Sequence, residues 1–269
     1  MVTVSPVAGA VGAVVDLDLR SADASDREVL VDAWHRHGVL FFRGQHLSAD
    51  EQVEAARIFG EPEHFEMARP VDGHPVVHEI RTGPPRRQGG ASRWHSDATW
   101  KQLPPRGSML QAVDLPPLGG DTLFASAHGA FETLSSRLQR LVLELTAMHA
   151  GGEALARAGQ RVERDVPDPV HHPVVRRHPG ADTPCLFVNS VFTQVLDDIP
   201  RRESAALLPL LVDVFKDPEL QCRFRWEPGD VAIWDNRAVQ HYAAPDYATE
   251  RLMHRVVLAG DPVTAFAAG

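Results

Sequence analysis

The segment RWHSDATW, residues 93–100, places a histidine and an aspartate two positions apart, a spacing that could supply part of a metal site. In an extended strand alternate side chains point to the same face, so His95 and Asp97 are predicted to project together. Aspartate is depleted in strands and is rarely buried unless it is paired or coordinates a metal. An isolated pair of this kind is more often an exposed edge-strand aspartate beside an ordinary histidine, so the rest of the chain must decide.

A further histidine with suitable surroundings is His241, at the end of the stretch GDVAIWDNRAVQH. Two histidines and one carboxylate occupy one face of an octahedral iron and leave positions open for oxygen and a co-substrate, which is why this ligand set is typical of non-haem Fe(II) oxygenases. The same donors can hold a catalytic zinc with a bound water. The residues alone therefore predict either an Fe(II) oxygenase or a zinc protein, which would be a hydrolase or a metal-binding module.

The elements that must position these side chains are mainly strands. Several short segments, often β-branched and separated by Pro, Gly, Asp or Asn, are predicted to be extended. They are GVLFFRG, HPVVHEI, SMLQAV, HPVVRRH, PCLFVN, CRFRWEPGDVAIWD and LMHRVVLAG. Many short strands with a few peripheral helices indicate a jelly roll or sandwich. The first and last strands of a jelly roll are neighbours, so this fold can bring residues 95 and 241 together.

Four helices are predicted around the strands. Capping boxes at Ser25–Glu28 and Ser48–Glu51 begin the first two, and a glycine near the end of each predicts where it stops. Apolar stripes at helical spacing predict two more, over residues 128–147 and 201–216. These stripes are read as core packing rather than as binding surfaces.

Composition limits the class of protein. No repeat, low-complexity tract or linker divides the sequence, so residues 1–269 are predicted to form a single domain, with active-site loops predicted at 82–92 and 151–169. A net charge of −9 argues against nucleic acid or an anionic membrane as partner. Only two cysteines are present, and neither a secretory leader nor a membrane-spanning stretch is found, which predicts a cytoplasmic protein that acts on a small molecule.

Several motifs together resemble the Fe(II)- and 2-oxoglutarate-dependent dioxygenases of the taurine dioxygenase (TauD/TfdA) family, whose fold is a double-stranded β-helix (jelly roll, cupin-like). They run in order over nearly the whole chain, from VLFFRGQ to about residue 261, and are RWHSDATW, GGDTLFAS, HPVVRRHP, LFVN and WEPGDVAIWDNRAVQHYAAPDYATERLMHRVVLAGD. The resemblance implies that His95, Asp97 and His241 are the iron ligands. It also implies that 2-oxoglutarate is bound by Thr122, Arg251 and Arg255: Thr122 and Arg251 hold its distal carboxylate, and Arg255 lies nearer the substrate or the metal-bound end.

The implied reaction is oxidation of an unactivated C–H bond, with Fe(II) as the metal, 2-oxoglutarate and O2 as co-substrates, and succinate and CO2 as co-products. Arg251 with Thr122 distinguishes this reading from a zinc hydrolase, which would not require them.

If Arg251 and Arg255 share a strand, they lie on one face roughly 13 Å apart at about 3.3 Å per residue, so they are predicted to serve different anions or different ends of the site. Family members are often dimers or tetramers, which implies a homo-oligomer.

The substrate is predicted to be anionic, but the enzyme is not predicted to be a dedicated taurine dioxygenase. Arg255 matches the family arginine that meets a sulfonate or sulfate, and a buried guanidinium without an anionic partner would be costly. Where taurine enzymes carry an asparagine, this chain has Ala91, which cannot hydrogen-bond through its side chain. His64 is an approximate counterpart of the substrate histidine, and Phe192 matches an aromatic wall. A bulkier, less polar sulfonate, sulfate ester or carboxylate is therefore predicted.

Three other histidines and two tryptophans are predicted to have structural rather than catalytic roles. His171, His172 and His178 look like a metal cluster, but they match a family strand that supplies no ligands. Trp94 and Trp234 are predicted to pack in the core.

Overall fold

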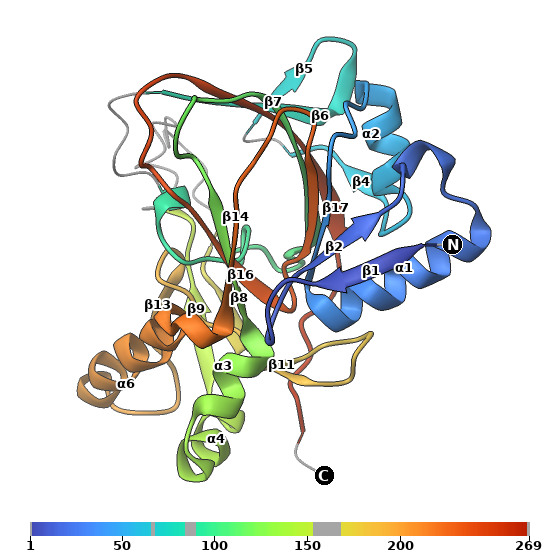
Figure 1. The fold of residues 1–269 in the computed structure, drawn as a ribbon. Coiled ribbons are helices and arrows are strands. Elements are labelled where there is room, and N and C mark those ends of the chain that lie inside the picture. The colour runs from blue at the N-terminus through green and yellow to red at the C-terminus, as the bar shows by residue number, and fades with distance from the viewer. Residues whose placement is uncertain (1, 66–67, 84–89, 153–167, 268–269) are drawn as a thin grey trace.

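A nine-stranded sheet forms one wall of the molecule in the computed structural model, which describes residues 2–65, 68–83, 90–152 and 168–267 (Figure 1). Its strands are β1 (Thr3–Pro6), β2 (Ala13–Asp16), β3 (Val39–Phe42), β4 (Pro62–Glu63), β5 (Arg69–Val71), β6 (His74–Thr82), β7 (Pro105–Asp114), β15 (Val231–Asp235) and β17 (Arg251–Gly260). They follow the order β1-β2-β3-β15-β7-β17-β6-β5, with β4 paired to β17 outside this path. Strands far apart in the sequence therefore lie side by side, among them β7 and β17.

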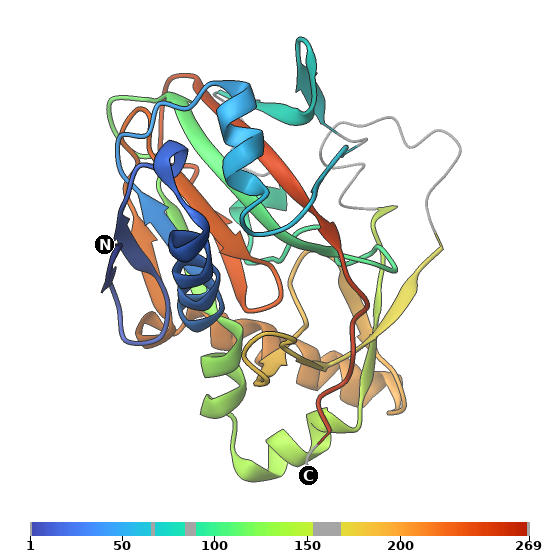
Figure 2. The same ribbon diagram turned by 90° about the vertical axis from the view of Figure 1, so that its right-hand side faces the viewer.

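A three-stranded sheet packs against one face of this wall. It consists of β14 (Gln221–Phe224), β8 (Thr122–Ser126) and β16 (Val239–Ala243), in that order. The rings of Phe41 and Phe224 stack between the two sheets, with centroids 4.1 Å apart. Phe124 continues this aromatic layer, 5.7 Å from Phe41 and from Trp234. Two sheets packed around an apolar layer, with helices outside them, confirm the predicted jelly roll (Figure 2).

Two smaller sheets complete the strand inventory of the described residues. One contains β9 (Thr146–His149), β10 (Val170–Pro173) and β13 (Thr193–Leu196) in the order β10-β9-β13, and the other pairs β11 (Val175–Arg177) with β12 (Pro184–Leu186). Their apolar residues share a core cluster with the helices on this side of the molecule, including Leu186, Leu196 and Leu211. This cluster also includes Ala125 of β8, so the region packs against the three-stranded sheet.

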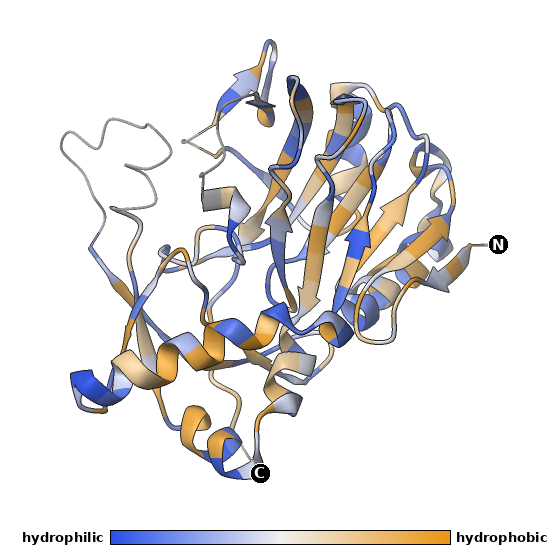
Figure 3. Ribbon diagram, turned by 60° about the vertical axis from the view of Figure 1, so that its left-hand side comes forward, coloured by the Kyte–Doolittle hydropathy of each residue, from blue (hydrophilic) through white to orange (hydrophobic). Residues whose placement is uncertain are grey.

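Helices cover the outside of both layers. They are α1 (Ala24–His37), α2 (Ala49–Ala56), α3 (Ala127–Thr133), α4 (Ser136–Leu143) and α6 (Arg201–Asp213), with short 3-10 turns η1 (Leu19–Ser21), η2 (Gly90–Ser92), η3 (Val214–Lys216) and η4 (Pro218–Leu220). On β3, Leu40 and Phe42 pack with Trp34 of α1, whereas Val39 and Phe41 face the three-stranded sheet. Both faces of β3 are buried, which explains its unbroken apolar sequence. Figure 3 shows hydrophobic residues along several strands of the molecule.

The start signals of the first two helices were predicted with mixed success. Ser48 and Glu51 form the predicted capping box of α2. The predicted box at Ser25–Glu28 is wrong, because the reciprocal hydrogen bonds are made by Asp23 and Asp26 and the helix begins earlier. Gly38 ends α1 with a φ of 71°, the left-handed conformation that favours glycine.

The third predicted helix, residues 128–147, is wrong as a single element. Leu134 takes an extended conformation at the end of α3, and the hydroxyl of Ser135 caps the next helix, α4, by accepting from the N–H of Leu138. From Thr146 the chain pairs with β10 and β13 as a strand. Tertiary pairing therefore overrides the continuous apolar stripe. The fourth predicted helix is confirmed as α6 followed by the 3-10 turn η3.

The two predicted active-site loops fall largely outside the described residues. Within 82–92, Thr82 ends β6 and Gly90–Ser92 form η2, while 84–89 are outside the description; of 151–169, residues 153–167 are outside it. No helix in the described part of the chain is long and apolar enough to cross a membrane.

Candidate active site

The three predicted metal ligands converge beside β16. One ligand atom from each of His95, Asp97 and His241 lies within 4.8 Å of the others. His241 belongs to β16, and His95 pairs with it through two backbone hydrogen bonds of 3.1 and 2.8 Å. The prediction that the jelly roll brings residues 95 and 241 together is therefore confirmed, although the pairing involves β16, the edge strand of the three-stranded sheet, rather than β17, the last strand of the chain.

The segment that carries His95 and Asp97 is not the predicted strand. Only His95 forms a bridge, and residues 97–100 form a turn in which Ala98 has a φ of 44°. The hydroxyl of Ser96 donates to the carbonyl oxygen of Val239 at 2.9 Å and fastens the segment to β16. A bridge followed by a turn, rather than strand alternation, thus places both side chains at the same point.

Both histidines present a neutral ring to the site. Nδ1 of His95 lies 2.7 Å from the carbonyl oxygen of Arg93 and donates to it, which leaves Nε2 for a metal. Burial lowers the pKa of His95. Burial, with the nearby His95, also lowers the pKa of His241 to about 3. Neutral imidazole is the form that binds a metal, so the rings need no deprotonation step at neutral pH.

The carboxylate of Asp97 is buried but ionised. Burial opposes its charge, yet the pKa of Asp97 is lowered to about 2, and the causes that persist beside neutral histidines are the charge of Arg255 and the hydrogen bond from Ser108. Its Oδ2 atom accepts hydrogen bonds from Ser108 Oγ at 2.9 Å and from Asn236 Nδ2 at 3.4 Å. Its Oδ1 atom lies 3.8 Å from Nε2 of His241 and 3.7 Å from Nη1 of Arg255. Two neutral imidazoles and one carboxylate oxygen form a donor set that fits Fe(II).

Arg251 is the residue whose surroundings most clearly call for a ligand. It lies at the start of β17, is 5% exposed, and its Nε and Nη2 atoms have no hydrogen-bond partner among the described residues. Its guanidinium carbon lies 5.9 Å from the ring centre of Trp226. A buried guanidinium without a counter-ion is costly, so the site fits the distal carboxylate of 2-oxoglutarate.

Thr122 belongs to the same polar group through Trp226. The indole Nε1 of Trp226 donates to Thr122 Oγ1 at 3.0 Å, and Thr122 itself is 3% exposed on β8. Because the hydroxyl oxygen accepts from the indole, its own proton is available to a carboxylate. Sequence reasoning missed Trp226. It stands in the WEPGD block beside the predicted site, but a tryptophan there is more often read as core.

Arg255 occupies different surroundings from Arg251, as their spacing predicted. Arg255 approaches Asp97, and its guanidinium carbon lies 4.9 Å from the ring centre of Phe65. Its Nε atom is buried without a hydrogen-bond partner among the described residues. The pairing of β17 with β7 shifts register between Leu252 and Met253, so a bulge separates the two arginines. One arginine therefore adjoins the metal ligands, and the other adjoins Trp226.

Of the predicted substrate residues other than Arg255, one lies next to a metal ligand and two are exposed. Phe192 is 8% exposed, and its ring centre lies 6.5 Å from that of His95. His64 is exposed, and its Nδ1 lies 2.8 Å from the carbonyl oxygen of Pro75. Ala91 is exposed on η2. The structure thus puts Phe192 at the ligands, whereas the buried aromatic beside Arg255 is Phe65, which sequence reasoning missed.

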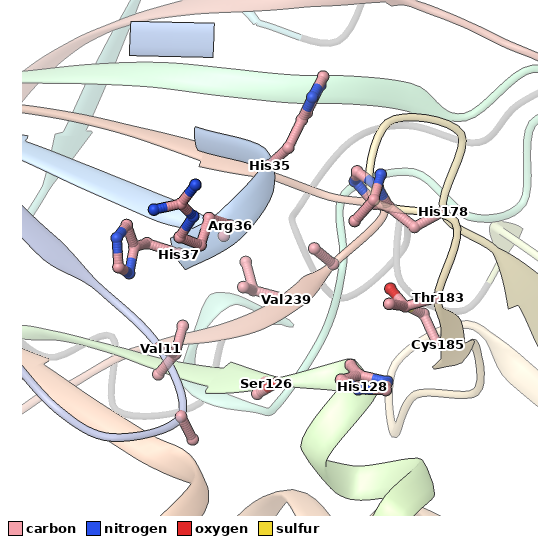
Figure 4. Close-up of a pocket in the computed structure, with 14 residues that line it drawn as sticks. Val11, His35, Arg36, His37, Ser126, His128, His178, Thr183, Cys185 and Val239 are labelled. Carbon is pink, nitrogen blue, oxygen red and sulfur yellow. The ribbon is translucent and has the colours of Figure 1, made fainter. Parts of the chain in front are cut away.

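The other histidines form no second metal cluster in the described part of the chain. Nε2 of His178 lies 2.9 Å from Oδ2 of Asp235, and its Nδ1 accepts from the N–H of Ala181. A pocket of about 260 Å³ is lined by His37, His128 and His178, among others. Figure 4 shows His37 and His128 on opposite sides of this pocket, so their rings do not converge on one ion.

Fold and site together define a 2-oxoglutarate-dependent dioxygenase. The family model described as "Taurine catabolism dioxygenase TauD, TfdA family" matches residues 3–257, and the chain therefore belongs to this family. This membership favours the oxygenase over the zinc alternative.

The chain matches several named relatives over most of their length. An alpha-ketoglutarate-dependent sulfate ester dioxygenase from Pseudomonas putida is 35% identical over 96% of this chain and 89% of the relative. An alkylsulfatase from Acinetobacter baylyi is 32% identical over 90% of this chain and 79% of the relative. The crystal structure of a taurine dioxygenase from Burkholderia xenovorans superimposes with a TM-score of 0.85, at 33% identity, over 98% of this chain and 93% of that one.

Proposed function

We propose that this protein uses Fe(II), 2-oxoglutarate and O2 to oxidise a C–H bond of a small organic acid, with His95, Asp97 and His241 holding the metal. The observation that carries the proposal is Arg251, a buried guanidinium beside Trp226 whose Nε and Nη2 atoms have no hydrogen-bond partner among the described residues. When bound, Fe(II) and 2-oxoglutarate supply the oxidant, and succinate and CO2 are the co-products.

The chain's own residues would bind and orient the co-substrate. Arg251 grips the distal carboxylate, because its planar fork can donate two parallel hydrogen bonds. Thr122 adds the hydroxyl proton that its contact with Trp226 leaves free. These contacts would place 2-oxoglutarate at one orientation relative to the ligands.

Alkyl sulfate esters are proposed as the first substrate class, with sulfonates and aryloxy carboxylates next. Arg255 offers a cation 3.7 Å from Asp97, and Phe65 and Phe192 are buried aromatic residues near it and near His95. A cation beside one apolar ring, with a second ring next to a metal ligand, suits an anion that carries a hydrocarbon body. The names of the relatives from P. putida and A. baylyi support sulfate esters.

The test combines a co-substrate assay with a substrate panel. Metal-free protein is supplied with Fe(II), 2-oxoglutarate and O2, and succinate is measured with alkyl sulfates, longer alkyl sulfonates, aryloxy carboxylates and taurine. We expect succinate only when Fe(II) and 2-oxoglutarate are both present, with an alkyl sulfate as best substrate. Taurine as best substrate by a wide margin would overturn the substrate proposal, and absence of 2-oxoglutarate binding would overturn the whole.

Arg255→Met separates the anion contact from the chemistry. This variant should lower kcat/KM for alkyl sulfates by about tenfold to a hundredfold, because a charge-assisted hydrogen bond to the substrate is lost. Arg225→Met is a control, since Arg225 lies on the exposed surface. Turnover that Arg255→Met leaves unchanged would contradict the proposed contact.

A homo-oligomer and a cytoplasmic location are also proposed, the first because TauD/TfdA enzymes are often dimers or tetramers. Light scattering coupled to size-exclusion chromatography measures the first directly. A mass equal to one chain across the micromolar range would contradict it.

A further inference from the structure

We infer that Ser108 and Asn236 are positioning residues that restrict Asp97 to a single metal-binding oxygen. The inference rests on the proposed metal site and extends it to two residues that do not touch the metal. Ser108 lies on β7 and is fully buried, whereas Asn236 follows β15 and is 3% exposed. They approach Asp97 from two different strands of the large sheet.

The two oxygens of Asp97 are in unlike surroundings. Oδ2 accepts from Ser108 at 2.9 Å and from Asn236 at 3.4 Å, so its lone pairs are engaged by the protein. Oδ1 accepts no hydrogen bond from the residues that the structure describes, and it faces His241 and Arg255 at 3.8 and 3.7 Å. Rotation of the carboxylate about its axis would break both bonds to Oδ2. The carboxylate is therefore held in one orientation.

The orientation of the Asn236 amide is itself fixed. Its Oδ1 atom accepts from the indole Nε1 of Trp234 at 2.9 Å and from the backbone N–H of Asp97 at 3.3 Å. A flipped amide would point its NH2 group at these two N–H donors, which cannot accept a hydrogen bond. The amide nitrogen therefore has to face Asp97. Trp234, predicted only as a core residue, thus also orients Asn236.

The backbone around Asn236 is held as firmly as its side chain. Its N–H donates to the carbonyl oxygen of Arg106 at 3.0 Å. Its neighbours Asp235 and Arg237 form a buried ion pair at 2.7 Å, and Arg237 also contacts Asp261 at 2.9 Å. The contact of Arg237 with Asp261, and that of Asp235 with Nε2 of His178 at 2.9 Å, anchor this turn to other parts of the fold.

A single-oxygen contact has a consequence for chemistry. An octahedral iron with two histidines and one carboxylate oxygen keeps three positions open, which suffices for a chelating co-substrate and oxygen. A carboxylate that offered both oxygens would occupy one more position and compete with the co-substrate. Ser108 and Asn236 would therefore protect co-substrate binding rather than metal binding.

The experiment measures two affinities on Ser108→Ala and Asn236→Ala. Mn(II) is titrated first by electron paramagnetic resonance, and 2-oxoglutarate is then titrated into the Mn(II)-loaded protein by calorimetry. We expect 2-oxoglutarate affinity to fall by about tenfold or more, the size of effect typical of residues that support metal ligands. Mn(II) affinity should be retained or rise, because the freed carboxylate can then offer both oxygens. Ser204→Ala is the matched control, because Ser204 is 2% exposed and its Oγ accepts one hydrogen bond, from the N–H of Leu196 at 2.8 Å, outside the site.

The outcomes separate this inference from the proposed function. Equal loss of Mn(II) and 2-oxoglutarate would overturn it, since the two residues would then serve metal binding as such. Wild-type affinities in both variants would overturn it as well. Failure of the wild-type, Mn(II)-loaded protein to bind 2-oxoglutarate would instead overturn the proposed function. Thermal unfolding of each variant, compared with Ser204→Ala, shows whether the fold is retained.

Discussion

The indole N–H of Trp226 donates a 3.0 Å hydrogen bond to the hydroxyl of Thr122, and the ring of Trp226 lies 5.9 Å from the guanidinium carbon of Arg251. One aromatic side chain thus contacts both residues that are assigned to the distal carboxylate of 2-oxoglutarate. By occupying a lone pair of the hydroxyl oxygen, it directs the hydroxyl proton away from itself. The co-substrate site is therefore a unit of three side chains rather than two.

Trp226→Phe keeps an aromatic ring but removes the N–H donor. The hydroxyl of Thr122 then becomes free to rotate, and affinity for 2-oxoglutarate should fall by roughly fivefold, the equivalent of about 1 kcal/mol for one net hydrogen bond. Calorimetric titration of 2-oxoglutarate into Mn(II)-loaded protein measures the loss. In a double-mutant cycle with Thr122→Val the two effects should be non-additive. Full additivity would contradict the coupling.

Arg251→Met is expected to weaken the binding of 2-oxoglutarate and to stabilise the metal-free fold. The arginine is 5% exposed, and burial lowers the pKa of its guanidinium. Without 2-oxoglutarate it is a buried charge, and two of its nitrogens have no partner in the part of the chain that the structure describes. Replacing it with an apolar side chain of similar length should raise the free energy of unfolding of the metal-free protein by about 1 kcal/mol. Affinity for 2-oxoglutarate should fall by about a hundredfold. Urea unfolding and calorimetry provide the two values, and a destabilised variant would contradict the argument.

The sequence was most informative where one short stretch carries the whole signal. Ser48 and Glu51 form their capping box within four residues, so local pattern alone was enough. His95 and His241 were recognised because each lies in a distinctive motif, and the jelly roll then brings them together. The predicted helix over 128–147 failed because Ser135 begins a new helix and β9 finds partners far along the chain.

The supporting residues of the site could not be read from the sequence. Ser108 and Asn236 reach Asp97 from positions 11 and 139 residues away along the chain, and neither stands in a spacing that suggests a shared role. Phe65 lies next to His64 in the sequence, yet in the fold Phe65 is buried and His64 is exposed. Such convergence depends on strand order and register, which local patterns do not determine.

The stability of the metal-free protein should fall as the solution becomes acidic, in part because of His149. Its side chain is fully buried, Nδ1 contacts Thr99 Oγ1 at 2.9 Å, and burial lowers the pKa of the ring to about 3. In the unfolded chain the ring binds its proton near its ordinary pKa of about 6.5. The contribution of His149 to the free energy of unfolding is therefore fully present above that pH and is lost progressively below it, down to about pH 3. Between pH 7 and pH 5 the loss from this residue is about 2 kcal/mol.

His149→Gln tests this assignment, since glutamine retains an acceptor but does not titrate. The difference in unfolding free energy between pH 7 and pH 5, measured with urea, should shrink by about 2 kcal/mol in the variant. His171→Gln is the control, because His171 lies on the neighbouring strand β10 and is exposed. The same pH dependence in wild type and His149→Gln would contradict the role of this ring.

Arg237→Met should destabilise the fold strongly, because it leaves the carboxylate of Asp235 buried with reduced compensation. Asp235 is 0% exposed and accepts from Arg237 at 2.8 and 2.7 Å, with Nε2 of His178 2.9 Å from its Oδ2. Burial opposes the charge, but Arg237 and His178 hold the pKa of Asp235 far below its usual range. Losing one partner of such a pair costs about 3 to 5 kcal/mol.

A double variant distinguishes the cost of leaving Asp235 unpaired from the loss of the ion pair as a whole. Asp235→Asn combined with Arg237→Met removes the buried charge together with its partner, so it should recover part of the stability that Arg237→Met loses. Arg177→Met is the matched surface control, since Arg177 contacts Asp182 at 2.9 Å with both side chains largely exposed, and its urea midpoint should barely change. If Arg237→Met lost no more than this control, the buried pair would not be holding the turn that carries Asn236.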